Sequence, residues 1–310
     1  MLSVTRSVRA VRAALIVCAL LHGLPAEAIV ESAADGMGTT SPPTDDPGFD
    51  HLGVTDTGLC AVYIGNGWVL SAAHVGQRPV TLGGVTYPDL PNSTVQLRHA
   101  TGPQSDFSIY RLAAKPPLPP LVLSNSPPSP SDTVTMMGYA WDRTPTQICW
   151  DSNWGEVSCG PPASHRGFKS AGPYRRRWGR NLVSAVGEDV DDGNGLTRGF
   201  HVLFDQSGVT YEAQAVPGDS GGAVFLKRNG QWQLVGVMFA VGVYPGQDYY
   251  SEVVFGQSTY ITDISYYRPQ LDAILSAPQI PALPWTAAVL AALLLAATGG
   301  AALSLRTRAR

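Results

Sequence analysis

The sequence predicts an all-β protein whose strands are short and joined by tight turns. Charged residues make up only 15% of the chain, below the roughly one quarter typical of soluble domains, so little amphipathic helix is expected. Glycine (33 residues) and proline (25 residues) are abundant, and both favour turns over helix interiors. With 310 residues and a net charge of −3, the chain can bury one large or two modest cores, and its charge does not indicate a nucleic-acid partner.

The first 28 residues have the three regions of a secretory signal peptide. Three arginines within the first 12 residues precede an apolar stretch at 13–24, and residues 26–28 read Ala-Glu-Ala, an A-x-A cleavage site. We therefore expect export, with signal peptidase as a processing partner. Cleavage would make Ile29 the new N-terminus.

A β-hairpin is predicted at residues 59–71, because two runs of β-forming residues flank the Gly-Asn-Gly turn at 65–67. Its second strand runs directly into His74. Asp106 begins another predicted strand at 105–112. Taken singly, such a histidine is more often structural, and such an acid is more often a turn or cap residue.

Seven prolines between residues 115 and 132 predict a stiff, extended boundary between two halves of similar size. In the second half, residues 141–180 are interpreted as a long irregular insertion. Its arginines at 175–177 are interpreted as a solvated loop face. A closing amphipathic helix is expected at 263–276. Further strands are expected at 133–140, 181–186, 200–204, 223–226, 233–239 and 258–262.

The insertion carries two cysteines, Cys149 and Cys159, ten residues apart. In an exported protein they are expected to form a local disulfide. Cys60 is then left unpaired and is expected to be buried as a small apolar residue.

The stretch at 216–225 reads VPGDSGGAVF, with Ser220 among three glycines. Glycine lets the backbone turn sharply, so that N–H groups can point inward around one hydroxyl. Acyl transfer needs this arrangement of a nucleophile and two amides aimed at a developing oxyanion. A short Gly-Ser cluster can also be a simple turn.

Residues 286–305 are 20 residues without a charge, followed by arginines at the end of the chain. At about 1.5 Å per residue this length spans the roughly 30 Å hydrocarbon layer. We expect a separate transmembrane helix, with the arginines cytoplasmic and the globular part outside. Together with residues 280–284, this tail (277–310) resembles bacterial C-terminal sorting signals, which implies either a retained membrane anchor or cleavage by a sorting protease.

With His74, Asp106 and Ser220 in that chain order, the sequence resembles the trypsin/chymotrypsin-like serine peptidases. The GDSGG motif at 218–222 matches the family's nucleophile motif, and Ser-Ala-Ala-His at 71–74 matches its histidine motif. Val75 stands where many members have a cysteine. The resemblance covers roughly residues 29–276.

The resemblance implies two antiparallel six-stranded β-barrels and a C-terminal helix, with the site in the cleft between the barrels. The first barrel would be 29–115, the Pro-rich linker 116–131, and the second barrel with its helix 132–276. It further implies that Ser220 is the nucleophile, His74 its general base and Asp106 the acid that orients the imidazole. The N–H groups of Gly218 and Ser220 would form the oxyanion hole. Peptide bonds of proteins or peptides would be the substrate.

The family also buries a freed N-terminal amine against the acid that precedes the serine, which here is Asp219. Ile29 and Val30 resemble the family's Ile-Val start. We hypothesise that signal peptidase itself exposes this terminus, although the following Glu31-Ser32 departs from the family's usual glycines.

Departures from the family pattern concern the primary substrate pocket. Gln214 stands where the trypsin branch has the acid that selects Lys or Arg, so a trypsin-like preference is not supported. Phe239 and Val241 replace part of the family's Ser-Trp-Gly strand and are expected to narrow the pocket toward small or medium uncharged side chains.

Two other classes of function stay open: a catalytically inactive homologue that binds a partner through the same cleft, and a structural surface protein. No cofactor is implied. No metal-ligand cluster stands out in the sequence, and the Asp and Asn residues at 189–194 are too weak a pattern for a Ca²⁺ site.

Overall fold

The computed structural model describes residues 29–32 and 39–277. These residues are almost entirely β, with one short α-helix, α1 (Ile264–Ser276). The chain divides into two compact units, Met1–Arg268 and Pro269–Arg310, and every strand belongs to the first. The predicted signal peptide and the predicted transmembrane segment lie outside the described residues. Within the described residues, no helix has the length and apolar character needed to span a bilayer.

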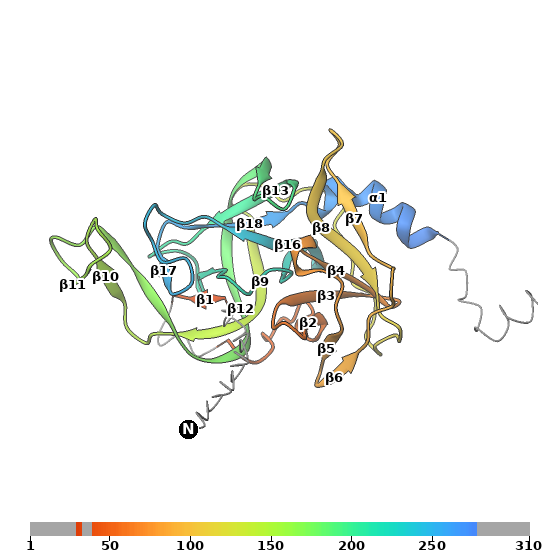
Figure 1. Cartoon of the computed structure of the whole chain (residues 1–310), viewed down its shortest axis with the longest axis horizontal. Helices are drawn as coiled ribbons and strands as arrows, with labels where there is room; N and C mark the ends of the chain where they lie inside the picture. The colour runs from red at the N-terminus through yellow and green to blue at the C-terminus, as the bar shows by residue number, and fades with distance from the viewer. Residues whose placement is uncertain (1–28, 33–38, 278–310) are drawn as a thin grey trace, which may run out of the picture. The chain divides into compact units, whose positions relative to one another are not determined.

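The first sheet contains seven antiparallel strands in the order β6-β5-β2-β3-β4-β8-β7 (Figure 1). The predicted hairpin is confirmed as β3 and β4, and every residue of both strands is buried. The predicted count of six strands is exceeded because the Gly83-Gly84 turn folds a short exposed strand, β6, back on β5. The bounds are β2 (Leu52–Thr55), β3 (Cys60–Gly65), β4 (Trp68–Ser71), β5 (Val80–Leu82), β6 (Val85–Tyr87), β7 (Val95–Arg98) and β8 (Gln104–Arg111).

The second sheet closes on itself as a six-stranded barrel, which agrees with the prediction. Its antiparallel pairings run β9-β12-β13-β18-β16-β15 and return from β15 to β9. Closure leaves no unpaired edge within the ring. The bounds are β9 (Thr133–Arg143), β12 (His165–Asp191), β13 (Leu196–Leu203), β15 (Ala223–Arg228), β16 (Gln231–Val241) and β18 (Ser258–Thr262).

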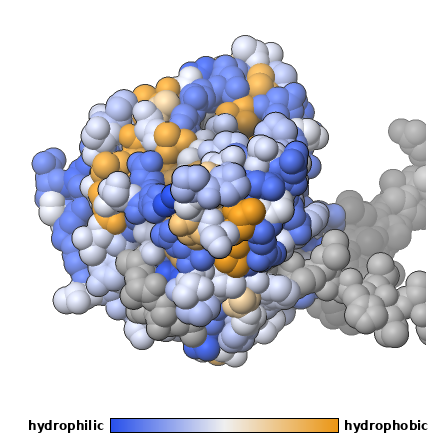
Figure 2. Space-filling view, turned by 90° about the vertical axis from the view of Figure 1, so that its left-hand side faces the viewer, coloured by the Kyte–Doolittle hydropathy of each residue, from blue (hydrophilic) through white to orange (hydrophobic). Residues whose placement is uncertain are grey.

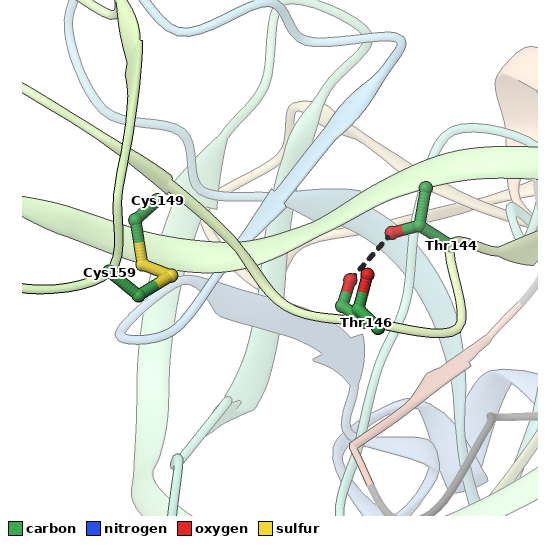
Figure 3. Close-up of a disulfide and its surroundings, with 4 residues drawn as sticks. All are labelled: Thr144, Thr146, Cys149 and Cys159. Carbon is green, nitrogen blue, oxygen red and sulfur yellow. Dashed lines mark hydrogen bonds between the residues drawn. A yellow bond between two sulfur atoms is a disulfide. The ribbon is translucent and has the colours of Figure 1, made fainter.

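The prediction of an irregular insertion at 141–180 is wrong, because most of this segment is a β-arm. β10 (Ile148–Trp150) pairs with β11 (Glu156–Val157) and with the start of β12, which also pairs with β17 (Glu252–Val254). The predicted disulfide between Cys149 and Cys159 is confirmed, and it joins β10 to the turn after β11 with a Cα–Cα distance of 5.2 Å (Figure 3). The face that carries the arm is largely hydrophilic, with separate hydrophobic patches (Figure 2).

The arginines at 175–177 are not a solvated loop face. They lie on β12, and the Arg177 side chain is buried against the buried carboxylate of Asp142. Arg175 Nε donates to the other Asp142 oxygen at 3.0 Å, and the Arg176 guanidinium lies 5.1 Å from the centre of the Phe49 ring. Asp142 on the neighbouring strand β9 thus pairs with Arg175 and Arg177, while Arg176 Nη1 lies 3.5 Å from Asp50 Oδ1. Local sequence does not reveal these partners.

The Pro-rich linker contains no named strand, as expected, and it forms hydrogen bonds with both sheets. Leu121 N–H donates to Ile64 C=O of β3 at 3.2 Å, and Ser124 N–H donates to Leu234 C=O of β16 at 2.9 Å. The linker therefore fastens the two sheets together along its length.

Candidate active site

His74 lies in a short 3₁₀ turn, η2 (Ala73–Val75), directly after the buried strand β4. Its Nδ1 is 2.5 Å from Oδ2 of Asp106, near the start of β8, and its backbone N–H donates to Asp106 Oδ1 at 2.8 Å. Both carboxylate oxygens of Asp106 are thus engaged by His74. The Asp106 side chain is fully buried, whereas the His74 side chain is 26% exposed, so Nε2 is the ring nitrogen left for chemistry.

The second barrel completes the surroundings of Asp106. The Asp106 N–H donates to Oγ1 of Thr197 on β13 at 2.8 Å. Burial lowers the pKa of His74, but the hydrogen bond and charge of Asp106, with a smaller contribution from Asp192, raise it above its usual value overall. The pair is therefore arranged to stabilise the protonated imidazole.

Ser220 lies in the loop between β14 (Ala213–Gln214) and β15, and it is partly exposed. Its loop is held tightly, because Gly221 N–H donates to Met238 C=O at 2.8 Å and Gly222 N–H to Asp219 C=O at 2.7 Å. In the described part of the chain, the N–H groups of Gly218 and Ser220 donate to no protein group. Hydrogen bonding within this loop therefore leaves these two N–H groups unused.

Contacts between the two sheets bring Ser220 to the segment that carries His74. The Cys60 N–H of β3 donates to Ser220 C=O at 2.9 Å, and Ser71 Oγ, three residues before His74, donates to Cys60 C=O at 2.9 Å. Gly221 has φ +86°, and a Cβ there would collide with Cys60 C=O, so only glycine fits. As expected, Cys60 is buried and unpaired.

Next to Ser220 is a small cavity of about 20 Å³, little more than the space one water needs. Both Phe239 and Val241, which are expected to narrow the substrate pocket, line this cavity, and the Phe239 ring also packs against Ala72 and Val75 beside His74. Tyr249, 39% exposed, completes the rim.

The expected pocket residue Gln214 is not among the residues that line this cavity. Its side chain is buried, and its Nε2 donates to Ser258 C=O at 3.1 Å. Within the described residues its Oε1 has no hydrogen-bond partner. The prediction that Gln214 belongs to the pocket therefore does not hold for this cavity, because its side chain is buried against Ser258.

The start of the described chain is inserted beside the Ser220 loop. β1 (Val30–Glu31) pairs antiparallel with β14, and Ile29 is buried in the core of the second barrel. The Asp219 carboxylate is also buried, and its Oδ2 accepts the Val216 N–H at 3.0 Å. A Cβ built on Gly138 would collide with Asp219 and approach Ile29 Cγ1 to 3.0 Å. The structure therefore places both members of the predicted pair against Gly138.

The sequence interpretation missed two residues of this site, Thr197 and Asp192. Both come from the β12–β13 hairpin, about 90 positions after Asp106. In the sequence, the acidic residues at 189–194 show only a weak Ca²⁺-like pattern. Nothing in the local sequence indicates that this hairpin packs on the strand that carries Asp106.

Donor atoms of His74, Asp106 and Asp192 all lie within 4.8 Å of one another. Among the described residues, this is the group whose ligand atoms lie near enough together to hold a metal ion. Because both Asp106 oxygens already interact with His74, we assign the group to the histidine–aspartate pair and not to a metal.

A family model described as a trypsin-like peptidase domain matches residues 58–237. A comparison with curated proteins found no match. Among solved structures, the chain is similar to neuropsin, a serine protease expressed in the limbic system of mouse brain, with 17% identity and a TM-score of 0.48 over 77% of this chain and 99% of that one. It is also similar to a mutant of human heparin binding protein, with 15% identity and a TM-score of 0.48 over 77% and 95% of the two chains. A third similar structure is an inactive mutant form of Rv3671c from M. tuberculosis H37Rv, with 15% identity and a TM-score of 0.40 over 78% and 98%.

Proposed function

Since the chain belongs to the trypsin-like peptidase domain family, we propose that it is a serine endopeptidase that cleaves protein or peptide substrates with Ser220, His74 and Asp106. The observation that carries this proposal is the 2.5 Å contact between His74 Nδ1 and the fully buried Asp106 carboxylate. A carboxylate held there fixes the imidazole tautomer, with a proton on Nδ1 and a free lone pair on Nε2.

In the proposed reaction, Ser220 Oγ attacks the scissile carbonyl carbon while His74 Nε2 takes the hydroxyl proton. The carbonyl oxygen becomes negative and is stabilised by the N–H groups of Gly218 and Ser220. His74 then gives its proton to the leaving amine, and an acyl-enzyme forms on Ser220. Water, activated by the same histidine, releases the acid product and restores the hydroxyl. The Asp106 carboxylate balances the charge of the imidazolium.

The preferred substrate has a small uncharged side chain on the acyl side of the cleaved bond. The cavity beside Ser220 is small, and Phe239 and Val241 occupy its lining. A peptide-library profile tests this preference, and strong cleavage after Lys or Arg would contradict it.

We further propose that the protein is exported, and that cleavage after Ala28 frees the Ile29 amine to pair with Asp219. Signal peptidase would be the processing partner, and the segment at 286–305 would anchor the domain on the outer face of the membrane, unless a sorting protease removes it. This is supported by burial of Ile29 and Asp219 around Gly138. N-terminal sequencing of active protein should give Ile29; any other start contradicts the activation step. Release of the domain from membranes on deletion of 286–305 tests the anchor.

Covalent labelling separates an active peptidase from an inactive homologue that binds a partner. A fluorophosphonate should label the wild-type protein, and Ser220→Ala should abolish the label. The matched control is Ser129→Ala, at an exposed serine of the linker, which should label as wild type does. A folded wild-type protein that stays unlabelled would favour the binding role.

A further inference from the structure

A second carboxylate, that of Asp192, lies beside the His74–Asp106 pair. One of its oxygens and one donor atom from each of the other two side chains lie within 4.8 Å of one another. Asp192 is not a strand residue; it lies in the turn that joins β12 to β13 and is partly buried. The mechanism proposed above uses only Asp106, so Asp192 is a charged group in the site without an assigned role.

The turn itself orients the Asp192 carboxylate. Asn194 donates twice to it, from its backbone N–H to Oδ1 and from its Nδ2 to Oδ2, each at 3.0 Å. Gly193 between them has φ +88°, a conformation that glycine adopts without strain. The carboxylate is therefore held in one orientation.

The hairpin is fixed on the strand that carries Asp106. Ser105 Oγ donates to Leu196 C=O at 2.9 Å, and Thr197 Oγ1 accepts the Asp106 N–H at 2.8 Å. A Cβ on Gly195 would lie 2.5 Å from Gln104 C=O and 2.9 Å from the Asp106 nitrogen, so the two backbones touch there. These contacts set the distance from Asp192 to His74 and leave little freedom to change it.

We propose that Asp192 is a positioning residue of this site, whose carboxylate supplies a second negative charge that stabilises the protonated imidazole of His74. The inference rests on the proposed function, since imidazolium forms when Ser220 gives up its proton. Asp106 fixes the ring through a hydrogen bond, whereas Asp192 acts on the ring through its charge.

The two carboxylates near His74, those of Asp106 and Asp192, both raise its pKa. Burial lowers its pKa, while the hydrogen bond and charge of Asp106 and the charge of Asp192 raise it. Burial raises the pKa of Asp192 itself, and the Asn194 hydrogen bonds oppose this. The charge of Asp106 and a side-chain hydrogen bond with Asp106 both raise it further. Asp192 therefore supports His74 only above its own elevated pKa.

Other charged groups of the hairpin are directed elsewhere. Asp189 lies 2.9 Å from His99 Nε2 on the β7–β8 side and also binds Arg198. Asp191 is exposed. This leaves Asp106 of β8 and Asp192 of the hairpin as the groups acting on the imidazole in the described residues.

The test is Asp192→Asn, a change that keeps the shape and an oxygen for the Asn194 N–H but removes the charge. In a Ser220→Ala background, the His74 ring is titrated by NMR, which requires no turnover. Loss of an opposite charge about 5 Å away should lower the His74 pKa by about one unit. In the Ser220 protein, the acidic limb of kcat/KM should move down by the same amount, with a several-fold lower plateau.

Asp191→Asn is the matched control, because it removes the same charge from the exposed neighbouring position. Solvent and salt screen an exposed charge, so the His74 titration should stay close to that of the parent protein. Asp192→Glu should restore most of the shift. An unchanged His74 titration in folded Asp192→Asn overturns the proposal even if the enzyme is active, and so does an equal shift in Asp191→Asn. A shifted titration in a protein without peptidase activity would support the electrostatic role and count against the proposed function instead.

Discussion

The substitution Gly138→Ala tests how strictly the second barrel holds the Ser220 loop. Gly138 lies on β9, and an added methyl would collide with the Asp219 carboxylate and approach Ile29 Cγ1 to 3.0 Å. The Asp219 carbon atom Cγ would be only 2.6 Å away, so the carboxylate has to move. Overpacking of this kind costs typically about 1–3 kcal/mol of the free energy of unfolding.

Activity should fall by more than this loss of stability explains. Asp219 accepts the Val216 N–H through Oδ2 at 3.0 Å and immediately precedes Ser220, so its displacement shifts the two amides proposed to bind the oxyanion. One misplaced donor lowers kcat by about 10²–10³-fold. We expect a decrease of that order at a temperature where the variant is fully folded.

Urea unfolding and kcat on a peptide substrate measure the two effects separately. Gly160→Ala is the matched control, because a Cβ there meets no atom within 4 Å and the backbone is not left-handed. It should change neither quantity. A Gly138→Ala protein with wild-type stability and kcat would refute the reasoning, because it would show that Asp219 can move without affecting Ser220.

Three further substitutions test single contacts. Asp106→Asn should lower kcat/KM by about 10⁴-fold with the fold intact by circular dichroism, because the amide no longer fixes the tautomer of His74; wild-type kcat/KM would rule out the role of Asp106. Arg177→Met should lower the free energy of unfolding by about 3–5 kcal/mol in urea titrations, because it leaves the buried Asp142 carboxylate poorly compensated; a loss under 1 kcal/mol would contradict this. Burial raises the pKa of Glu212 to about 7 from 4.5. Between these two pH values the folded state retains a proton that the unfolded state has lost. The free energy of unfolding should therefore fall by about 3 kcal/mol as pH rises from about 4.5 to 7. Glu212→Gln should remove that fall in urea titrations at several pH values, and an unchanged pH dependence would exclude Glu212 as its source.

Features governed by short-range chemistry could be predicted from the sequence. The β3–β4 hairpin follows from a Gly-Asn-Gly turn between two apolar runs, and the disulfide follows from two cysteines ten residues apart in a predicted exported chain. The site between the sheets could be predicted only by resemblance to a family, because spacing alone left His74 and Asp106 with ordinary structural explanations.

The β-arm and the burial of Arg177 could not be predicted, because their partners are distant in sequence. Arg177 is buried through Asp142, 35 residues earlier on the neighbouring strand. Viewed locally, three successive arginines indicate a solvated segment. Strand pairing places a carboxylate opposite them, and that pairing is set by register between strands and not by composition. Asp192 was missed for the same reason.

The candidate site depends on contacts that each cross between the two sheets. Thr197 of the second barrel accepts the Asp106 N–H, Cys60 of the first sheet donates to Ser220 C=O, and Phe239 packs beside His74. None of these contacts lies within one sheet, so a small shift of one sheet against the other misaligns the site while both cores stay packed. Since reacting groups displaced by about 1 Å can cost about 10²-fold in rate, substitutions between the sheets should lose activity before they lose stability. Substitutions inside either core should lose both together.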